Sequence, residues 1–304
     1  MFDSPTFDFD SYIKYRPPYS DKLYAEIYQY HESHGGQWNL AHDAGTGAGI
    51  VAEELSTKFT TVAASDPSAV YLEQARRRLS LRDKFLFGCY PGEDMSWLPD
   101  AGVDMITMAE AIHWAEPQDV VTAASKALRP GGTLAIWHYD VIPIFVGSTE
   151  AQDAFNELFD HWSSRLIEGA PEAKLANLER AVRMTVLRMA EIEFDKSEWK
   201  TGVHRIYWNA YHPTVGITHQ AAFKDVKVQE NPDDVVDRRI DETILSQYAD
   251  IDWIRGYMNH LYPDVPADDT EQDKDMFEKL ARIMEGRKLR LSWTVTMILA
   301  TKSN

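Results

Sequence analysis

A glycine-rich turn and the acids around it are the residues of this sequence whose types and spacing suit chemistry. In Asp43-Ala-Gly45-Thr-Gly47-Ala-Gly49, three glycines follow an acid at alternate positions. Glycine lets the backbone bend sharply and lets a ligand lie against the main chain. The helix expected after the turn presents free backbone N–H groups to a bound molecule. By itself such a turn is also compatible with a purely structural bend, but its place between a strand and a helix favours ligand binding.

Two further acidic positions follow the next two expected strands. Asp66 lies 23 residues beyond Asp43, where a carboxylate can accept hydrogen bonds from both hydroxyls of a ribose. One acid of the pair Glu93-Asp94 is expected to receive an adenine amino group. The dinucleotide fingerprint is G-x-G-x-x-G, whereas the spacing here is G-x-G-x-G, and no G-x-x-x-x-G-K-[ST] loop is present. An acid before the turn repels a pyrophosphate but suits an ammonium and a sulfonium, so these residues predict S-adenosylmethionine rather than NAD or ATP.

The elements that position these residues alternate over the first half of the chain. Strands are expected at 39–43, 60–66, 84–88, 103–109 and 132–137, and helices at 50–56, 69–79 and 118–128. Short strands with intervening helices indicate a parallel sheet covered on both faces, which is the α/β class. After Pro143 the pattern changes to amphipathic helices around 155–166 and at 175–192, 244–261 and 273–284, with strands at 222–229 and 288–301. The later helices predict a cap inserted between strands of the core.

Composition narrows the kind of protein further. The chain has 304 residues, and its 31 Lys and Arg against 48 Asp and Glu give a formal net charge of −17. A field of that sign disfavours nucleic acid and anionic membranes as partners. No apolar stretch is long enough to span a bilayer, and the N-terminus lacks the pattern of a secretory signal. With a single cysteine, Cys89, and no zinc-type motif, a cytoplasmic protein without disulfide or metal is expected. The oligomeric state stays open.

Four motifs together resemble class I S-adenosylmethionine-dependent methyltransferases. They are the glycine turn, Ser65-Asp-Pro-Ser68, Ala109-Glu-Ala-Ile-His-Trp114 and Leu128-Arg-Pro-Gly-Gly-Thr-Leu-Ala-Ile-Trp137. Tyr12-Ile-Lys-Tyr-Arg-Pro-Pro-Tyr19, with the His113-Trp114 pair and Tyr139, is similar to the fungal trans-aconitate methyltransferase group. The resemblance covers about residues 8–145. It implies a doubly wound, Rossmann-like sheet of seven strands whose last strand is antiparallel, S-adenosylmethionine as methyl donor, and a small acidic acceptor. Thr46, where cysteine is commoner, and His42, where an apolar residue is usual, depart from the pattern.

The candidate site residues follow from these motifs. The cofactor is expected to contact Tyr15, Asp43, Gly45, Thr46, Gly47, Asp66, Pro67, Glu93, Asp94, Ala109 and Glu110. The acceptor is expected to face Arg16, His113 and Trp114. Arg16 either binds an acceptor carboxylate or pairs with a surface acid, and His113 either faces the acceptor or is a structural histidine bonded to backbone. His204–Trp208, expected within the cap, is a weaker candidate, and a packed helix or turn is favoured there.

The expected reaction is methyl transfer to a carboxylate or hydroxyl oxygen of a small molecule. A sulfonium donor is already activated, so the protein mainly aligns the reactants and excludes water. A carboxylate acceptor needs no general base, whereas a hydroxyl benefits from one. Two alternatives are a cofactor-binding protein that catalyses a non-methylating reaction or regulates a partner, and an NAD-dependent dehydrogenase, which the glycine spacing disfavours. The expected organisation is an N-terminal lid at 1–30, a cofactor-binding core at 31–145, a helical cap at 146–215, and further core strands with a second helical insertion at 216–304.

Overall fold

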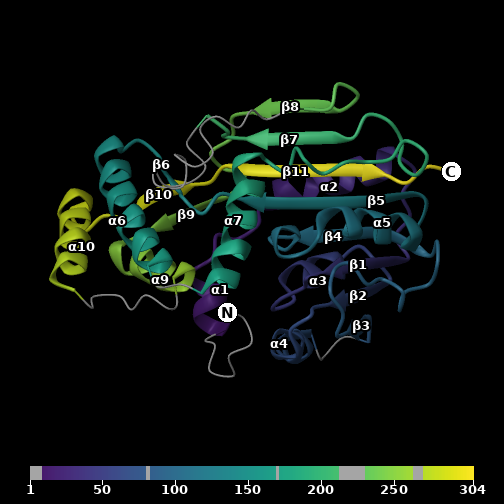
Figure 1. Ribbon diagram of the computed structural model, residues 1–304, viewed down its shortest axis with the longest axis horizontal. Coiled ribbons are helices and arrows are strands. Elements are labelled where there is room, and N and C mark those ends of the chain that lie inside the picture. Colours follow the sequence, from purple (N-terminus) through teal and green to yellow (C-terminus); the bar gives the residue numbers. More distant parts are fainter. Residues whose placement is uncertain (1–8, 80–82, 169–170, 212–229, 263–269) are drawn as a thin grey trace.

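The centre of the molecule is an eight-stranded sheet with helices on both faces. The computed structural model describes residues 9–79, 83–168, 171–211, 230–262 and 270–304. The order of the strands is β3-β2-β1-β4-β5-β11-β7-β8 (Figure 1). The strands are β1 (Leu40–Ala44), β2 (Thr61–Ser65), β3 (Phe85–Gly88), β4 (Val103–Ala109), β5 (Leu128–Tyr139), β7 (His204–Trp208), β8 (Val235–Arg239) and β11 (Val295–Thr301).

The predicted α/β fold is confirmed, with one difference in the number of strands. Strands β3, β2, β1, β4 and β5 pair in parallel, and β11 runs antiparallel to both of its neighbours, β5 and β7. The sheet has eight strands rather than seven, because β8 adds to β7 in parallel at the edge. The strand expected at 222–229 lies outside the described residues.

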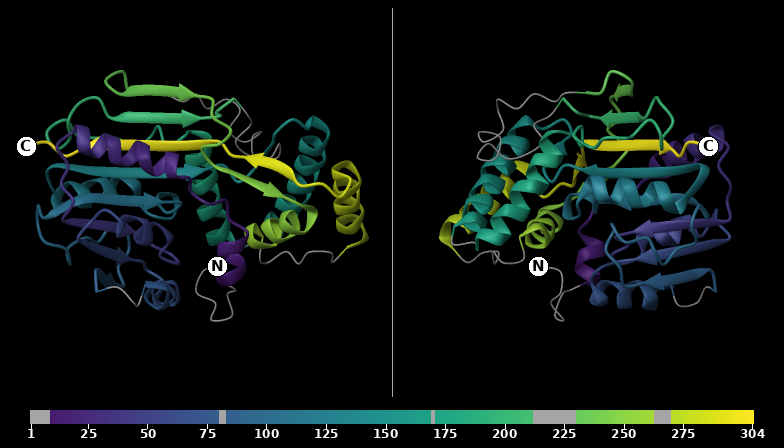
Figure 2. Two further views of the ribbon diagram at one scale, coloured as in Figure 1. Left: turned by 180° about the vertical axis from the view of Figure 1, so that it is seen from behind. Right: turned by 45° about the vertical axis from the view of Figure 1, so that its right-hand side comes forward.

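Helices cover the two faces of this sheet. Figure 2 shows α2 lying along one face, while α5 and α7 lie on the other face in Figure 1. All residues of β1, β2 and β4 are buried except one half-buried residue at an end of each strand, as parallel strands covered on both faces require. The helices of this part are α2 (Asp21–Ser33), α3 (Ile50–Leu55), α4 (Ala69–Leu79), α5 (Pro117–Ala127) and α7 (Glu172–Val186), with a short 3₁₀ helix, η1 (Ile112–Trp114).

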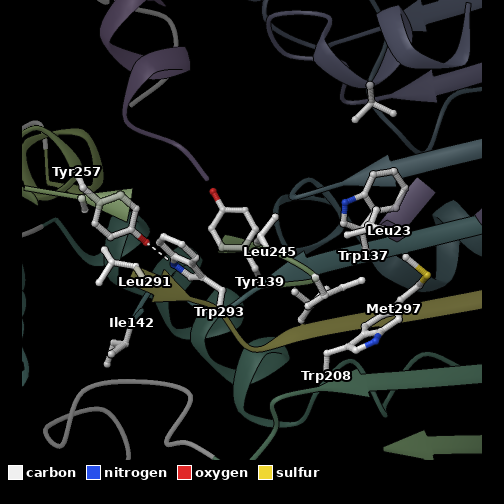
Figure 3. Packing of buried hydrophobic residues seen from close by; sticks show 14 of the residues in the cluster. Leu23, Trp137, Tyr139, Ile142, Trp208, Leu245, Tyr257, Leu291, Trp293 and Met297 are labelled. Atoms are coloured by element: carbon white, nitrogen blue, oxygen red, sulfur yellow. Dashed lines mark hydrogen bonds between the residues drawn. The ribbon is translucent and has the colours of Figure 1, made fainter. Parts of the chain in front are cut away.

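A second lobe lies beyond the carboxyl ends of β4 and β5 (Figure 1). It consists of α6 (Thr149–Ile167), α9 (Ile251–Leu261), α10 (Glu271–Met284) and a three-stranded sheet of β6 (Ile144–Phe145), β10 (Leu289–Ser292) and β9 (Ser246–Ala249). The single strand expected at 288–301 is therefore divided between the two sheets. The division falls at Trp293, which is fully buried and donates from Nε1 to the hydroxyl of Tyr257, 3.3 Å away (Figure 3). None of the helices in the described ranges is both long and apolar enough to cross a bilayer.

The N-terminal residues are held against the second lobe. Helix α1 (Phe9–Lys14) packs on α9, and Trp253 donates from Nε1 to the Lys14 carbonyl at 3.1 Å. The Tyr15 ring packs edge-on against Trp253, with 6.3 Å between ring centroids. Gly256 makes room for Tyr15, because a Cβ on this glycine would lie 2.2 Å from the Tyr15 ring. The segment that follows α1 is thereby placed across the ends of the central strands.

His204–Trp208 forms a core strand, so its expected place in a cap helix or turn is wrong. Burial at Arg205–Trp208 and pairing with β11 and β8 define β7. Arg205 is buried and binds Asp234 through Nε at 2.5 Å. Its Nη1 and Nη2 donate to the carbonyls of Met189 and Ile192 at 3.0 and 2.7 Å. Arg205 is therefore a structural residue that fixes the connection between α7 and β7.

We predict that Arg205→Leu destabilises the protein by roughly 3–5 kcal/mol, because Asp234 would stay buried without its cation. Equilibrium unfolding in urea measures this loss. The double variant Arg205→Leu/Asp234→Leu removes both charges and is expected to be more stable than the single variant. A loss under about 1 kcal/mol for Arg205→Leu, the range of exposed ion pairs, would contradict the structural role.

Candidate functional site

A cleft of about 830 Å³ lies at the carboxyl ends of β1, β2 and β4 and is closed on one side by residues 12–19, here called the lid segment. Ligands of open α/β sheets bind at this edge. Eleven of the fourteen candidate residues line the cleft, and Tyr15, Asp94 and His113 do not. The candidates that line it are Arg16, Asp43, Gly45, Thr46, Gly47, Asp66, Pro67, Glu93, Ala109, Glu110 and Trp114.

The glycine turn forms the floor of the cleft. Gly45 and Gly47 have φ values of +71° and +54°, in the region that favours glycine. A Cβ on Gly45 would lie 2.6 Å from the Cβ of Ala111, so the turn approaches the end of β4 more closely than any other residue type allows. Thr46 donates its backbone N–H to the Ser65 carbonyl at 2.8 Å. The turn is therefore fixed against both neighbouring strands.

Asp43, the next-to-last residue of β1, has a buried carboxylate that joins three elements. Its Oδ2 accepts from Thr46 Oγ1 at 2.7 Å and from the Ala52 backbone N–H at 3.1 Å. Its Oδ1 accepts from Thr107 Oγ1 at 2.9 Å. Burial raises the pKa of Asp43 to about 6, while these hydrogen bonds act in the opposite direction. A cation in the cleft would stabilise the ionised form of this carboxylate.

Asp66 lies opposite the turn, at the end of β2. Its Oδ2 accepts the backbone N–H of Gly47 at 3.0 Å and its Oδ1 accepts that of Ser68 at 2.9 Å. The carboxylate is thus held at the rim of the turn by two main-chain donors. Each carboxylate oxygen can accept a second hydrogen bond, so Asp66 can receive hydroxyl groups of a ligand without leaving this position.

The structure separates the two members of the acidic pair Glu93-Asp94. Glu93 lines the cleft, and its Oε1 accepts the Glu116 backbone N–H at 2.7 Å. Asp94 instead turns away, and its Oδ1 accepts both the backbone N–H and the hydroxyl of Ser96, at 3.1 and 2.7 Å. These bonds to Ser96 lower the pKa of the Asp94 carboxyl. Of the two acids, only Glu93 lines the cleft.

Arg16 supplies positive charge to the opposite end of the cleft. Its Nε donates to Nε2 of His260 at 3.1 Å, and its Cζ lies 4.4 Å from the centre of the Tyr12 ring. The sequence left open a pairing of Arg16 with a surface acid, but in the structure Arg16 donates to His260 instead. Burial lowers the pKa of His260 to about 3, with Arg16 acting in the same direction, so His260 is a neutral acceptor. Arg16 is held by its Nε, while its side chain faces the cleft.

Glu110 follows β4 and has an unusual backbone. Its φ of +51° lies in the left-handed region, which residues other than glycine seldom adopt. Its Oε1 accepts the Tyr139 backbone N–H at 2.5 Å. Burial raises the pKa of Glu110 to about 7, although the Arg16 guanidinium lowers it. Tyr139, at the end of β5, also lines the cleft, and Figure 3 shows its hydroxyl directed toward the lid segment.

Tyr15, Asp94 and His113 are not part of the cleft lining. Tyr15 packs on α9, as described above. His113 lies on η1 with its ring centre 4.9 Å from that of Trp114, and burial lowers its pKa to about 3. Within the described residues the His113 side chain makes no hydrogen bond to backbone, so neither of its two expected roles is observed. Trp114 lines the cleft and is 45% exposed.

Several aromatic residues of the cleft were missed from the sequence. The missed residues are five tyrosines that line the cleft: Tyr12, Tyr19, Tyr24, Tyr71 and Tyr139. Tyr12, Tyr19 and Tyr139 belong to the motifs that carried the family resemblance, which was the available signal. Tyr71 lies on α4, where an aromatic residue at helical spacing predicts only core packing. Its ring packs edge-to-face against the Phe9 ring, with 4.8 Å between the ring centroids.

Comparisons with known proteins agree with this geometry. Residues 42–136 match the family model described as "Methyltransferase domain". The chain is 28% identical to methyltransferase cfoB of Aspergillus candidus, over 96% of this chain and 94% of that protein. It is 29% identical to methyltransferase tpcM of Aspergillus fumigatus, over 96% of this chain and 91% of that protein. A putative type II methyltransferase from Anaeromyxobacter dehalogenans shares the fold, with a TM-score of 0.59 and 18% identity over 94% of this chain and 97% of that one.

The residues of the cleft fit S-adenosylmethionine. Gly47 has an open face toward the cleft, since a Cβ there would meet only Tyr71 and Tyr12 at ordinary contact distances of 3.7 to 4.0 Å. Acids at three successive strand ends suit a cationic nucleoside and disfavour a pyrophosphate. Together with the match of residues 42–136 to the methyltransferase domain and with relatives matched over nearly their full length, this shows that the protein is an S-adenosylmethionine-dependent methyltransferase.

Proposed function

We propose that the enzyme transfers the methyl group to an oxygen atom of a small molecule bound between Arg16, Glu110 and Trp114. The observation that carries the proposal is that one cleft joins the glycine turn to a second end lined by Arg16, Tyr19, Glu110, Trp114 and Tyr139. A volume of about 830 Å³ lies in the upper part of the range of small-molecule sites, which supports a cofactor and an acceptor side by side.

The cofactor end is proposed to consist of Gly45, Thr46, Gly47, Asp66, Pro67 and Glu93, with Asp43 below the turn. When bound there, S-adenosylmethionine supplies a methyl group activated by a cationic sulfur. Asp43 and Asp66 provide negative charge, and the backbone of the turn provides a close surface for the ligand. Glu93 is the acid proposed for the adenine amino group, because Asp94 is engaged by Ser96.

The acceptor end is proposed to orient the nucleophilic oxygen and to exclude water. Arg16 is half-buried beside Tyr12 and is anchored through His260, so it can offer donors to an oxygen acceptor in a fixed direction. Trp114 is proposed to cover the acceptor from the mouth of the cleft. The resemblance to the trans-aconitate methyltransferases, carried by the lid segment and the His113-Trp114 pair, supports an acceptor with oxygen functions and leaves a carboxylate as one candidate.

Replacing Asp66 is expected to weaken cofactor binding. A hydrogen bond to a charged group contributes about 1.5–3 kcal/mol, so Asp66→Ala is expected to raise the Kd for S-adenosylmethionine by about 10- to 150-fold in isothermal titration calorimetry. The matched variant Asp94→Ala removes a neighbouring acid that does not line the cleft, and its Kd is expected to stay within about twofold of wild type. Equal effects of the two variants would refute the assignment.

Cofactor affinity is expected to depend on pH through Asp43. Because burial raises the pKa of Asp43 to about 6, the carboxyl is protonated below that pH in the free protein and ionised above it. A cationic ligand binds the ionised form better, so affinity should rise as pH increases from 5 to 7 and then level off. Calorimetry across this range measures the effect. The dependence should persist in Glu110→Gln and disappear in Asp43→Asn; a flat profile in the wild-type protein would contradict this role of Asp43.

The proposed reaction is tested by supplying methyl-labelled S-adenosylmethionine with four sets of small molecules that bear hydroxyls, carboxylates, amines or thiols. Label in the oxygen compounds, identified by mass spectrometry, is the expected result. Label only in amines or thiols would refute oxygen methylation. Cofactor binding without any transfer would favour the alternative in which the protein catalyses a non-methylating reaction or regulates a partner.

A further inference from the structure

We infer that Glu110 is the general base of the reaction and that the acceptor oxygen is a phenolic hydroxyl. The inference rests on the proposed transfer to oxygen and makes it more specific. It assigns Glu110, expected from the sequence to contact the cofactor, to the acceptor instead. The geometry of the β4 end, the charges around it and the aromatic walls of the cleft support it independently.

The first support is the position of the Glu110 side chain. Its Oε1 is fixed by the Tyr139 backbone N–H at 2.5 Å. Within the described part of the chain, Oε2 receives no hydrogen bond, and the residue lines the cleft. The φ of +51° is a strained value for glutamate, and such strain is characteristic of functional sites. One oxygen therefore anchors the carboxylate while the other remains able to accept a proton.

The second support is the charge around Glu110. Arg16 is the cation that acts on this carboxylate. A carboxylate acceptor would place two negative groups beside one guanidinium in a partly buried cleft, which costs free energy. A neutral hydroxyl adds no charge and can donate its proton to Oε2. The other groups near Glu110 are Tyr12 and Tyr19 of the lid segment, Tyr139 and Asp140 at the end of β5, and Tyr257 of α9.

The third support is the aromatic character of the walls. Tyr19, Trp114 and Tyr139 all line the cleft, and Trp114 is 45% exposed. Flat aromatic molecules pack favourably against such rings. A phenol is also far more acidic than an aliphatic alcohol, with a pKa near 10 as in tyrosine. Burial of Glu110 raises its pKa toward that of a phenol, which makes proton transfer between them more favourable.

The step is balanced without a further reactant. The acceptor oxygen forms a bond to the methyl carbon as the carbon–sulfur bond of the sulfonium breaks, and the electron pair of that bond returns to sulfur. The hydroxyl proton passes to Oε2 of Glu110. The products are a methyl ether, a neutral thioether and a protonated Glu110, which loses its proton to water after the products leave.

The test compares phenols with carboxylic acids in wild type and in Glu110→Gln. Glutamine keeps an acceptor for the Tyr139 N–H but cannot take a proton. The probes are 2-naphthol and 4-methylphenol, each paired with the aryl carboxylic acid of the same ring, together with trans-aconitate. Glu73→Gln makes the same chemical change at an exposed ion pair with Arg77 and serves as the control. Glu110→Asp retains a base and guards against a folding defect of the glutamine variant.

We expect methylation of the phenols, with kcat about 10²- to 10⁴-fold lower in Glu110→Gln and cofactor affinity at neutral pH within about twofold of wild type. Glu110→Asp should recover part of the rate, and Glu73→Gln should match wild type. In wild type, kcat should rise with pH through about 7, as Glu110 ionises, and Glu110→Gln should lose this rise, whereas Asp140→Asn should retain it. Infrared titration of the protonated-carboxyl band, which needs no acceptor, should show a group near pH 7 that is absent from Glu110→Gln.

Three outcomes would overturn the inference. The first is phenol methylation at the wild-type rate in a folded Glu110→Gln protein. The second is methylation of the carboxylic acids or trans-aconitate with no methylation of phenols, which would leave oxygen transfer intact while refuting the base. The third is no transfer to any oxygen compound by a wild-type protein that binds the cofactor, which would refute the proposed function and the inference together.

Discussion

The carboxylate of Asp43 is the group on which the geometry of the site depends. A buried carboxylate must be hydrogen-bonded, because an unsatisfied charge in the interior is very costly. The three donors come from the glycine turn, helix α3 and strand β4, through Thr46, Ala52 and Thr107. Satisfying one charged group therefore fixes three elements relative to one another. The same burial raises the pKa of Asp43 to about 6. A cationic ligand bound in the cleft would therefore stabilise the ionised form of this carboxylate.

The lining of the cleft as a whole carries more acidic than basic side chains. Its lining includes Asp43, Glu53, Glu54, Asp66, Glu93 and Glu110, against Arg16 and Arg78. Arg78 is engaged in an ion pair with Glu53 at 2.5 Å, so the positive charge near the acceptor end comes from Arg16. That guanidinium is delivered by the lid segment, whose position depends in turn on the packing of Tyr15 over Gly256 and on His260. The acidic end of the cleft is thus built into the core, whereas the basic end is built from an element that lies on the second lobe.

The difference between these two ends explains what the sequence could predict. Asp43, Gly45, Gly47 and Asp66 are close in sequence to the strands that position them, so local spacing located them correctly on the cleft. The choice between Glu93 and Asp94 depends on one turn around Ser96, which spacing does not specify. His113 and Tyr15 do not line the cleft, because their surroundings include α7 and α9, more than 50 residues away in sequence. Strand β7 and the division of residues 288–301 into two strands were not predicted from the sequence for the same reason. Both are defined by pairing with strands that are distant in sequence.

The close contact between the turn and the end of β4 connects the two ends of the cleft. Gly45 approaches Ala111 so closely that a Cβ on the glycine would lie 2.6 Å from the alanine Cβ. Glu110 is the residue immediately before Ala111, so the distance between the glycine turn and the Glu110 carboxylate is set by this contact of two small residues. A larger residue at either position would push the turn away from the strand end. A glycine at position 110 would adopt the φ of +51° more readily than glutamate does, yet it would lack the carboxylate. The strained glutamate is therefore best explained by a requirement of the site rather than of the fold, because the fold alone would be served better by glycine.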